Sequence, residues 1–269
     1  MTQHMNDRRQ LAVVTGASSG IGLELALQFT DNGFDLILNA DYEVLEEAAE
    51  RCRERGAEVT AVRQDLRTPA GVEALYTVVT AGGRPVDAAA VNAGVGRGGL
   101  FVETPVADLL EVLEVNVAST VHLTRLLLAD MVARGEGRLL LTSSIAATMP
   151  GTYSAVYNAS KSFIQSLGEA LQVEVEETGV TVTLLIPGPT ETNFFDRAQM
   201  DDTRVGQGNK DDPADVARQG FEALMAGRSR VVAASLATKA QEVLGKVLPD
   251  RVKAKRYEKM AEPQDEASS

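Results

Sequence analysis

The sequence predicts an α/β fold in which a doubly wound parallel sheet of about seven strands carries helices on both faces. Apolar segments alternate with amphipathic helical segments along most of the chain. The apolar segments are hydrophobic at successive positions, which is typical of strands that are buried on both faces of a parallel sheet. A glycine-rich turn joins the first of these strands to the first helix. Right-handed crossovers make such a sheet doubly wound, with ligands outside the carboxyl ends of its strands.

Each element is predicted from hydrophobic periodicity and from the residues that begin or end helices. The strands are predicted over 11–15, 34–40, 58–62, 86–91, 138–142, 180–186 and 230–233. The helices are predicted over 23–30, 43–55, 69–80, 105–134, 154–178 and 213–225. Glycines follow three of these helices, at Gly56, Gly135 and Gly179, and are typical of helix ends.

The polar segment 191–212 interrupts this alternation at the edge of the sheet where ligands bind. A long polar insertion there is more often a lid than a packed element. The segment 236–260 is amphipathic and increasingly basic. We therefore predict one domain over 1–235 and a C-terminal helical extension with a frayed tail over 236–269. The basic helix is expected to pack with one face in solvent, and binding to a membrane surface or a partner is the less favoured alternative.

Composition limits the classes of function. The chain has 269 residues, of which 44% are apolar, and it contains no apolar run near the length of about 18 residues that crosses a bilayer. Its net charge of −12 argues against general nucleic-acid binding, because a phosphate backbone would be repelled. The single Cys52 cannot form an internal disulfide, and two histidines leave little for a metal site. Residues 1–9 resemble no signal or transit peptide. We expect a soluble, cytoplasmic protein without a metal and without membrane association.

The turn after the first predicted strand is suited to an anion. It places Gly16, Gly20 and Gly22 between the strand and the helix. Glycine lets another group approach the backbone closely, and the first helical turn offers unpaired N–H groups at the positive end of its dipole. A pyrophosphate is the most plausible ligand. The spacing Gly-x3-Gly-x-Gly differs from the commoner dinucleotide fingerprint, so the glycines alone could equally serve only to turn the chain.

Several separated segments coincide with the motifs of one family, in order and at fitting spacings. They are Thr15-Gly-Ala-Ser-Ser-Gly-Ile-Gly22, Asn92-Ala-Gly94, Asn116, Ser144, Tyr157-Asn-Ala-Ser-Lys161, and Pro187-Gly188 with Thr192. Over about 10–235 the chain therefore resembles the classical short-chain dehydrogenase/reductase (SDR) family, which implies a Rossmann-like fold. One departure is Val91, where the family usually has Asn, and it is expected to affect a structural contact more than the chemistry.

The predicted catalytic residues are Asn116, Ser144, Tyr157 and Lys161. Tyr157 and Lys161 lie four residues apart on a predicted helix, hence on one face. A tyrosinate that acts near neutral pH needs stabilisation of about 3 pKa units, or about 4 kcal/mol, and a nearby ammonium has the right sign. The resemblance implies that Tyr157 is the general acid/base for hydride transfer and that Lys161 lowers its pKa and binds the nicotinamide ribose.

The resemblance also gives roles to the other two catalytic residues. Ser144 would hydrogen-bond the substrate oxygen, and Asn116 would distort its helix and hold a water that relays protons to Lys161. From the residues alone, Asn116 could instead be a satisfied buried amide, and a Tyr/Lys pair on a helix is usually surface decoration.

Asp41 decides the expected cofactor. It follows the second predicted strand, near the distance of about 20 residues from the glycine turn that is expected for an acid binding the adenosine ribose. Its carboxylate would repel a 2′-phosphate, and neither Ser19 nor Tyr42 is basic. NAD is therefore preferred over NADP. The alternative is that Asp41 only caps the helix that begins near Tyr42.

The resemblance assigns further residues to the cofactor, at its adenine, phosphate and nicotinamide ends. Together with Asp41, Tyr157 and Lys161 they are Gly16, Ser18, Ser19, Gly20, Ile21, Gly22, Asp65, Leu66, Asn92, Ala93, Gly94, Pro187, Gly188, Thr190 and Thr192. For the substrate, a small-molecule alcohol or ketone, the predicted contacts are Ser144, Tyr153 as a pocket wall and Phe194. Phe194, Phe195 and Met200 indicate an apolar or amphipathic substrate, although the two phenylalanines could equally anchor the lid.

The predicted function is an NAD-preferring oxidoreductase that interconverts a secondary alcohol and a ketone. The alternative is a cofactor-binding regulatory protein without turnover, because a fold does not entail a function. By analogy with the family, we expect a homodimer or homotetramer that pairs through the helices over 105–134 and 154–178. Close packing there would use small residues, namely Ala118, Ser119, Ala159, Ser160 and Gly168.

Overall fold

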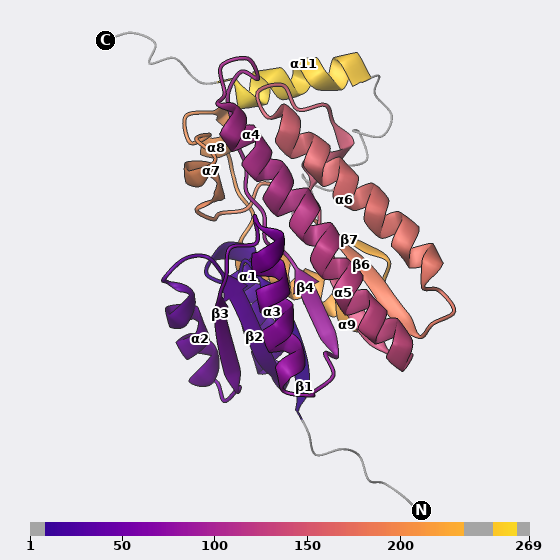
Figure 1. Cartoon of the computed structure of the whole chain (residues 1–269). Helices are drawn as coiled ribbons and strands as arrows, with labels where there is room; N and C mark the ends of the chain where they lie inside the picture. Colours follow the sequence, from indigo (N-terminus) through magenta and orange to yellow (C-terminus); the bar gives the residue numbers. More distant parts are fainter. Residues whose placement is uncertain (1–8, 234–249, 263–269) are drawn as a thin grey trace, which may run out of the picture.

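The protein is described by a computed structural model over residues 9–233 and 250–262. Within these residues one sheet has the strand order β3-β2-β1-β4-β5-β6-β7, and every neighbouring pair is parallel. The strands are β1 (Gln10–Thr15), β2 (Phe34–Ala40), β3 (Val59–Arg63), β4 (Ala88–Val91), β5 (Gly137–Thr142), β6 (Val180–Pro187) and β7 (Arg230–Ala233). Figure 1 shows the sheet with helices packed around it. The predicted doubly wound α/β fold is confirmed.

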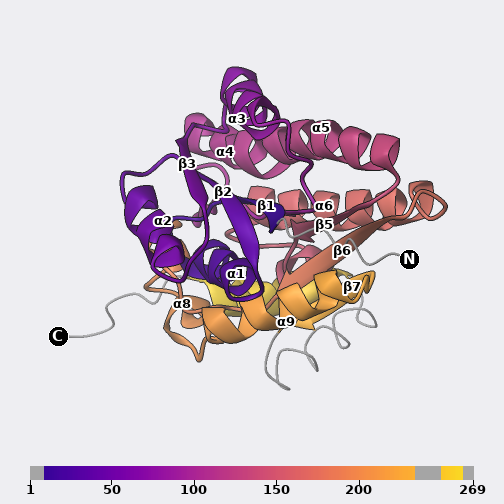
Figure 2. The ribbon, with the colours of Figure 1, turned by 90° about the horizontal axis from the view of Figure 1, so that it is seen from below.

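The helices form two layers, one on each face of the sheet, as Figure 2 shows. The first layer contains α3 (Pro69–Ala81), α4 (Val106–Leu113), α5 (Ser119–Arg134) and α6 (Ala155–Glu174). The second contains α1 (Gly20–Asp31), α2 (Leu45–Arg53) and α9 (Pro213–Met225). Successive β1 residues face opposite layers: Val13 joins the core under the first layer and Val14 the core under the second. Both cores exclude water, which explains why the strands are apolar at successive positions.

The strand order reverses direction between β1 and β4. From β1 the chain moves to β2 and β3 on one side, and it returns to β4 on the other. The connections after β1 and β4 therefore leave the sheet in opposite directions and open a crevice at the carboxyl ends of the strands, where open α/β sheets bind their ligands.

The helix predicted over 105–134 is continuous but contains one irregular turn. A π-helical turn, η1 (Glu114–Ala118), separates α4 from α5 and places Asn116 inside the protein. Val106–Arg134 is, among the described residues, long and apolar enough to span a membrane by length and composition alone. The core explains much of this apolar character, because Leu123 and Leu127 pack under the first helix layer. This stretch is only weak evidence for a membrane.

The segment 191–212 is more packed than its polar sequence suggests. It contains two short helices, α7 (Phe194–Arg197) and α8 (Arg204–Gln207), and its ends are joined by a bridge between Thr190 and Asp211. Phe195 and Met200 are buried and pack in one cluster with Tyr257 of α11 (Asp250–Ala261). Within the predicted helical extension, α11 is the described helix, and residues 236–249 and 263–269 lie outside the described residues.

The small residues predicted to allow close packing between subunits fall into two groups. Ser119, Ser160 and Gly168 are buried inside the chain, where a Cβ on Gly168 would lie 2.6 Å from the Leu184 side chain. The expectation that these three residues allow close packing between subunits is therefore wrong, because they pack against their own chain. Ala118 and Ala159 are exposed. The oligomer remains a prediction.

Candidate active site

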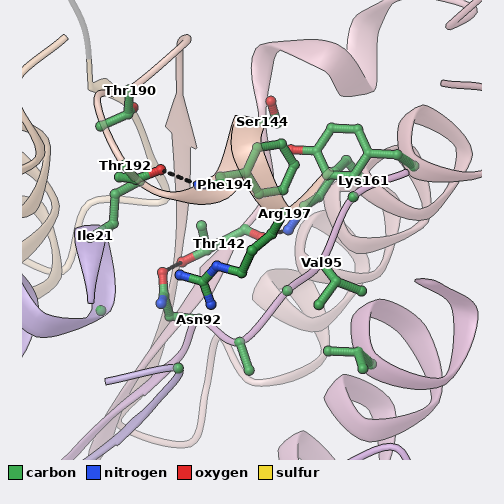
Figure 3. A pocket seen from close by; sticks show the side chains of 18 of the residues that line it. Ile21, Asn92, Val95, Thr142, Ser144, Lys161, Thr190, Thr192, Phe194 and Arg197 are labelled. Carbon is green, nitrogen blue, oxygen red and sulfur yellow. Dashed lines mark hydrogen bonds between the residues drawn. The ribbon is translucent and has the colours of Figure 1, made fainter. Parts of the chain in front are cut away.

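A cavity of about 370 Å³ lies at the carboxyl ends of the strands. Its walls come from the loops that follow β1, β2, β3, β4, β5 and β6, together with α6, the segment 191–212 and α11. Figure 3 shows side chains from these separate elements turned toward one another. All of the residues predicted to bind the cofactor line this cavity, from Gly16 to Thr192. The fold thus gathers at one place residues that lie far apart in the sequence.

The glycine turn after β1 forms a tight cradle. Gly16 and Gly20 have φ values of +66° and +56°, which favour glycine. A Cβ on Gly22 would lie 2.1 Å from the Gly16 carbonyl oxygen, so no larger residue fits this turn. Ser19 is the N-cap of α1, but its side chain does not cap the helix. The first amides of α1 lie at the cavity wall, so the cradle fits the pyrophosphate of a dinucleotide.

Asn92 joins the glycine cradle to the ends of the neighbouring strands through hydrogen bonds. Its Nδ2 donates to the Thr15 carbonyl oxygen at 3.2 Å, and its Oδ1 accepts from the Thr142 hydroxyl at 3.0 Å. Its backbone N–H donates to the Thr15 hydroxyl at 3.0 Å. The side chain therefore joins the ends of β1, β4 and β5, the strands on either side of the reversal in strand order.

The end of the cavity that is predicted to hold the adenosine is formed by the loops after β2 and β3, where Asp41 lies exposed at the cavity wall. The N-cap of α2 is Val44, so the alternative that Asp41 caps this helix is wrong, because the helix begins later than the sequence suggests. The Asp65 carboxylate is paired with Arg67 at 2.8 Å, and hydrogen bonds from Arg67 lower its pKa. Arg67 also lines the cavity and was missed by the sequence reasoning.

Ser144, Tyr157 and Lys161 meet at the other end of the cavity. Ser144 begins the 3₁₀ turn η2 (Ile145–Thr148) just after β5, and its hydroxyl accepts from the Ala146 N–H at 3.1 Å. The Ser144 side chain also lies beside the Tyr157 phenol and opposes the rise of its pKa. Lys161 lies one turn further along α6, with its Nζ 5.9 Å from the centre of the Tyr157 ring. Tyr157 and Lys161 therefore lie on one face of α6, as their spacing of four residues predicts.

Burial shifts the pKa of both titratable groups. It raises the pKa of Tyr157 well above its ordinary value, and the Ser144 side chain opposes this only in part. It lowers the pKa of Lys161 to about 8, while the Nζ donates to the Thr142 carbonyl oxygen at 3.1 Å. The sequence reasoning expected Lys161 to lower the pKa of Tyr157. The net shift of the Tyr157 pKa is upward because the desolvation of the phenol is the largest effect, and the lowering by Lys161 stays a prediction.

Asn116 lies behind the cavity wall and does not line it. Its Oδ1 accepts from the Val95 N–H at 2.8 Å, and its Nδ2 donates to the Val95 carbonyl oxygen at 2.9 Å and the Ser160 hydroxyl at 3.0 Å. A Cβ on Gly94 would lie 3.3 Å from this Oδ1 and 3.2 Å from the Lys161 Nζ. Because Gly94 has no side chain, the small space beside it is bordered by the Asn116 Oδ1 and the Lys161 Nζ.

The end of the cavity that is predicted to hold the substrate is closed by the segment 191–212 and by α11. Phe194 lies beside Tyr157, with 5.2 Å between the ring centres, whereas Phe195 is a buried anchor. Tyr153 does not line this cavity. It lines a second cavity of about 200 Å³, and its φ of +64° places it in a left-handed turn before α6. The prediction that Tyr153 is a wall of the substrate pocket is therefore not supported by its position.

The structure adds residues that the sequence did not indicate. Tyr257 and Met260 of α11 line the cavity, although they follow Tyr157 by about a hundred residues. Arg197 of α7 also lines it, and its guanidinium donates to the Ser19 hydroxyl at 2.8 Å. The amphipathic pattern of the C-terminal segment indicated a helix that packs on the protein, but not where it packs.

Comparison with known proteins gives one consistent result. The family described as short chain dehydrogenase matches residues 10–203. Oxidoreductase UcpA of Salmonella typhimurium is 32% identical over 208 residues, which are 76% of each chain. A short chain dehydrogenase/reductase from Burkholderia phymatum in complex with NAD has a TM-score of 0.81 and 27% identity, covering 97% of this chain and 98% of that one. A metagenomic short-chain oxidoreductase in complex with NADP has a TM-score of 0.70 and 27% identity, covering 84% and 96%. The chain therefore belongs to the short-chain dehydrogenase/reductase family of oxidoreductases.

Proposed function

We propose that this protein interconverts a secondary alcohol and a ketone by hydride transfer, with NAD preferred and Tyr157 as the general acid/base. One observation carries the proposal: Ser144, Tyr157 and Lys161 converge on the same end of a cavity whose other end is a glycine cradle. When bound, the nicotinamide cofactor would supply or accept the hydride. The chain's own residues would hold the substrate oxygen and move its proton.

In the direction of reduction, the hydroxyls of Ser144 and Tyr157 would both donate to the ketone oxygen. Because burial raises the pKa of Tyr157, its phenol stays protonated at neutral pH and can act as the acid. The proton would pass from the Tyr157 hydroxyl to the oxygen as negative charge develops there. Lys161, with a pKa of about 8, is mostly charged at pH 7 and would stabilise the resulting phenolate. In the direction of oxidation, the phenolate would accept the proton of the alcohol.

Asn116 is proposed to help return the proton. Its Oδ1 and the Lys161 Nζ flank the small space beside Gly94. A water held between them would link Lys161 to the interior of the protein. The hydrogen bonds of Asn116 to Val95 and Ser160 fix the orientation of its amide for this role.

The preference for NAD rests on Asp41. Its carboxylate lies at the cavity wall just after β2, where it would accept hydrogen bonds from the adenosine ribose and repel a 2′-phosphate. Solved relatives hold NAD or NADP, so the choice is made by local residues. The substrate end is lined by Met149, Phe194 and Tyr257, which favour an apolar or amphipathic small molecule.

We further propose a cytoplasmic homodimer or homotetramer, organised as one catalytic domain with the segment 191–212 as its lid. Exposed apolar residues on the first helix layer support a pairing surface. They are Val106, Leu110, Leu113, Val121 and Val132 on the helix from α4 to α5, and Phe163 and Val173 on α6.

Fluorescence titration with NADH and NADPH, followed by a panel of ketones, tests the proposal. We expect tighter binding of NADH and turnover with some ketones. Asp41→Ala should reduce the discrimination between the two nucleotides, because it removes the repulsion of a 2′-phosphate. Discrimination that is unchanged in Asp41→Ala would contradict the ribose role. Nucleotide binding without turnover across a broad panel would favour the regulatory alternative.

A further inference from the structure

We propose that Arg197 binds a phosphate group of the dinucleotide and so links cofactor binding to the position of the segment 191–212. The inference rests on the proposed function, because it concerns the same cavity. Arg197 is the last residue of α7, and its exposed side chain lines the cavity. Figure 3 shows this long side chain extending among the residues of the pocket.

The guanidinium of Arg197 lies at the adenosine side of the glycine cradle. Its Nη2 donates to the Ser19 hydroxyl at 2.8 Å, and its Cζ lies 5.2 Å from the centre of the Tyr42 ring. Ser19 directly precedes the first residue of α1, and Tyr42 directly follows Asp41. The cation therefore stands between the place proposed for the pyrophosphate and the place proposed for the ribose.

The chemistry of this position suits an anion. A guanidinium presents several N–H donors in one plane, which match the oxygens of a phosphate. Its side-chain partner at the cradle is the neutral Ser19 hydroxyl, and its contact with Tyr42 is with the face of a ring. A phosphate would be a stronger partner than the hydroxyl, since it carries the opposite charge and can accept two parallel N–H bonds from the guanidinium. The protein has a net charge of −12, which repels an anionic ligand, and a cation at this site opposes that repulsion locally.

Arg197 is coupled to the catalytic end through its own short helix. Phe194, three residues earlier, lies beside the Tyr157 ring. The Arg197 carbonyl oxygen accepts from the Arg97 Nη1 at 2.7 Å, and Arg97 is paired with Glu111 of α4 at 3.1 Å. A phosphate that holds the Arg197 side chain would thus also hold Phe194 over the catalytic tyrosine.

Two phosphates could be the ligand. The pyrophosphate is present in both NAD and NADP, whereas the 2′-phosphate is present in NADP alone. Ser19 adjoins the N-terminus of α1, which favours the pyrophosphate. The experiment below separates the two sources.

The test compares Arg197→Met and Arg197→Lys with Arg204→Met, using NADH and NADPH fluorescence titrations of the full-length protein. Arg204 is an exposed arginine of the same segment that does not line the cavity. We expect Arg197→Met to weaken binding at least about tenfold, Arg197→Lys to restore part of it, and Arg204→Met to leave it unchanged. Equal losses for both nucleotides would support the pyrophosphate as ligand, and a loss for NADPH alone would support the 2′-phosphate. Affinities of Arg197→Met equal to those of the wild type for both nucleotides would overturn the inference.

Hydrogen exchange of the segment 191–212 provides a second readout that does not depend on turnover. Added NADH should slow exchange there in the wild type and in Arg204→Met, but not in Arg197→Met. Equal slowing in all three would overturn the proposed coupling. A wild-type protein that binds neither nucleotide would instead overturn the proposed function, so the two failures are distinguishable.

Discussion

Replacing Lys161 with methionine is expected to stabilise the folded protein while removing its proposed activity. The lysine is only 6% exposed, and its Nζ donates to the Thr142 carbonyl oxygen at 3.1 Å. Burial lowers the pKa of this amine from 10.5 to about 8. At neutral pH the fold therefore holds a charged group that would be more stable in water.

The magnitude follows from the size of this change. A pKa that falls from 10.5 to about 8 corresponds to about 3 kcal/mol of lost stability at pH 7, at about 1.4 kcal/mol for each pKa unit. Methionine keeps most of the apolar stem but leaves the Thr142 carbonyl without its donor, at a cost of about 1–2 kcal/mol. We therefore expect Lys161→Met to raise the free energy of unfolding by about 1–2 kcal/mol at pH 7.

The effect should depend on pH with a definite sign. Below pH 8 the amine is protonated in both the folded and the unfolded chain, so the whole cost is present. Between pH 8 and 10.5 the unfolded chain binds more protons, so the stability of the wild type rises with pH relative to the variant. Above pH 10.5 the cost has disappeared.

Urea denaturation of the wild type and of Lys161→Met at pH 7 and pH 10 measures this difference. The stability advantage of the variant should be largest at pH 7 and should shrink or reverse at pH 10. A variant that is less stable than the wild type at pH 7, with a difference that does not change with pH, would refute the argument that the ammonium is buried at a cost.

Three further predictions concern the glycine cradle, the Phe194 ring beside Tyr157, and the oligomer. Gly22→Ala should abolish NADH binding in a fluorescence titration, because its Cβ would lie 2.1 Å from a carbonyl oxygen, whereas Gly82→Ala, where a Cβ meets no atom within 4 Å, should bind normally. Phe194→Ala should admit water to Tyr157 and reduce the rise of its pKa, so the alkaline loss of ketone reduction should move to lower pH in a pH–rate profile. An unchanged alkaline limb would count against this. Phe163→Glu, at a side chain that is 43% exposed, should shift the protein to a smaller species in light scattering, and an unchanged mass would argue against pairing through α6.

The fold could be predicted because its signals are local. The strand expected over 34–40 is β2, and all of its residues are buried, as is typical of a strand covered on both faces of a parallel sheet. The helix expected over 213–225 is α9, which begins at a proline and is capped by Asp212. The same local logic placed Tyr157 and Lys161 on one helical face.

The remainder of the site depends on contacts between distant segments. Arg197 and Ser19 are 178 residues apart, and no periodicity or spacing connects them. The packing of Phe195 and Met200 on α11 likewise joins segments whose sequences look polar or basic. Propensity and spacing describe neighbours in sequence and therefore could not predict these contacts.

The position of Tyr153 differs from the expectation for an identifiable physical reason. Tyr153 was predicted to face the substrate from its closeness in sequence to Tyr157, but its left-handed backbone places it beside another cavity. The rise of the Tyr157 pKa by burial could not be predicted either, because desolvation depends on all surrounding atoms, which the sequence does not reveal.

The most direct test of the central claim is the ketone reduction rate of Tyr157→Phe at saturating NADH, with Tyr153→Phe as the matched control outside the main cavity. We expect Tyr157→Phe to bind NADH normally and to lose turnover by a factor of about 100 or more, because it lacks the acid that protonates the substrate oxygen. Tyr153→Phe should retain turnover. A Tyr157→Phe variant that reduces the same ketones at the wild-type rate would contradict the account.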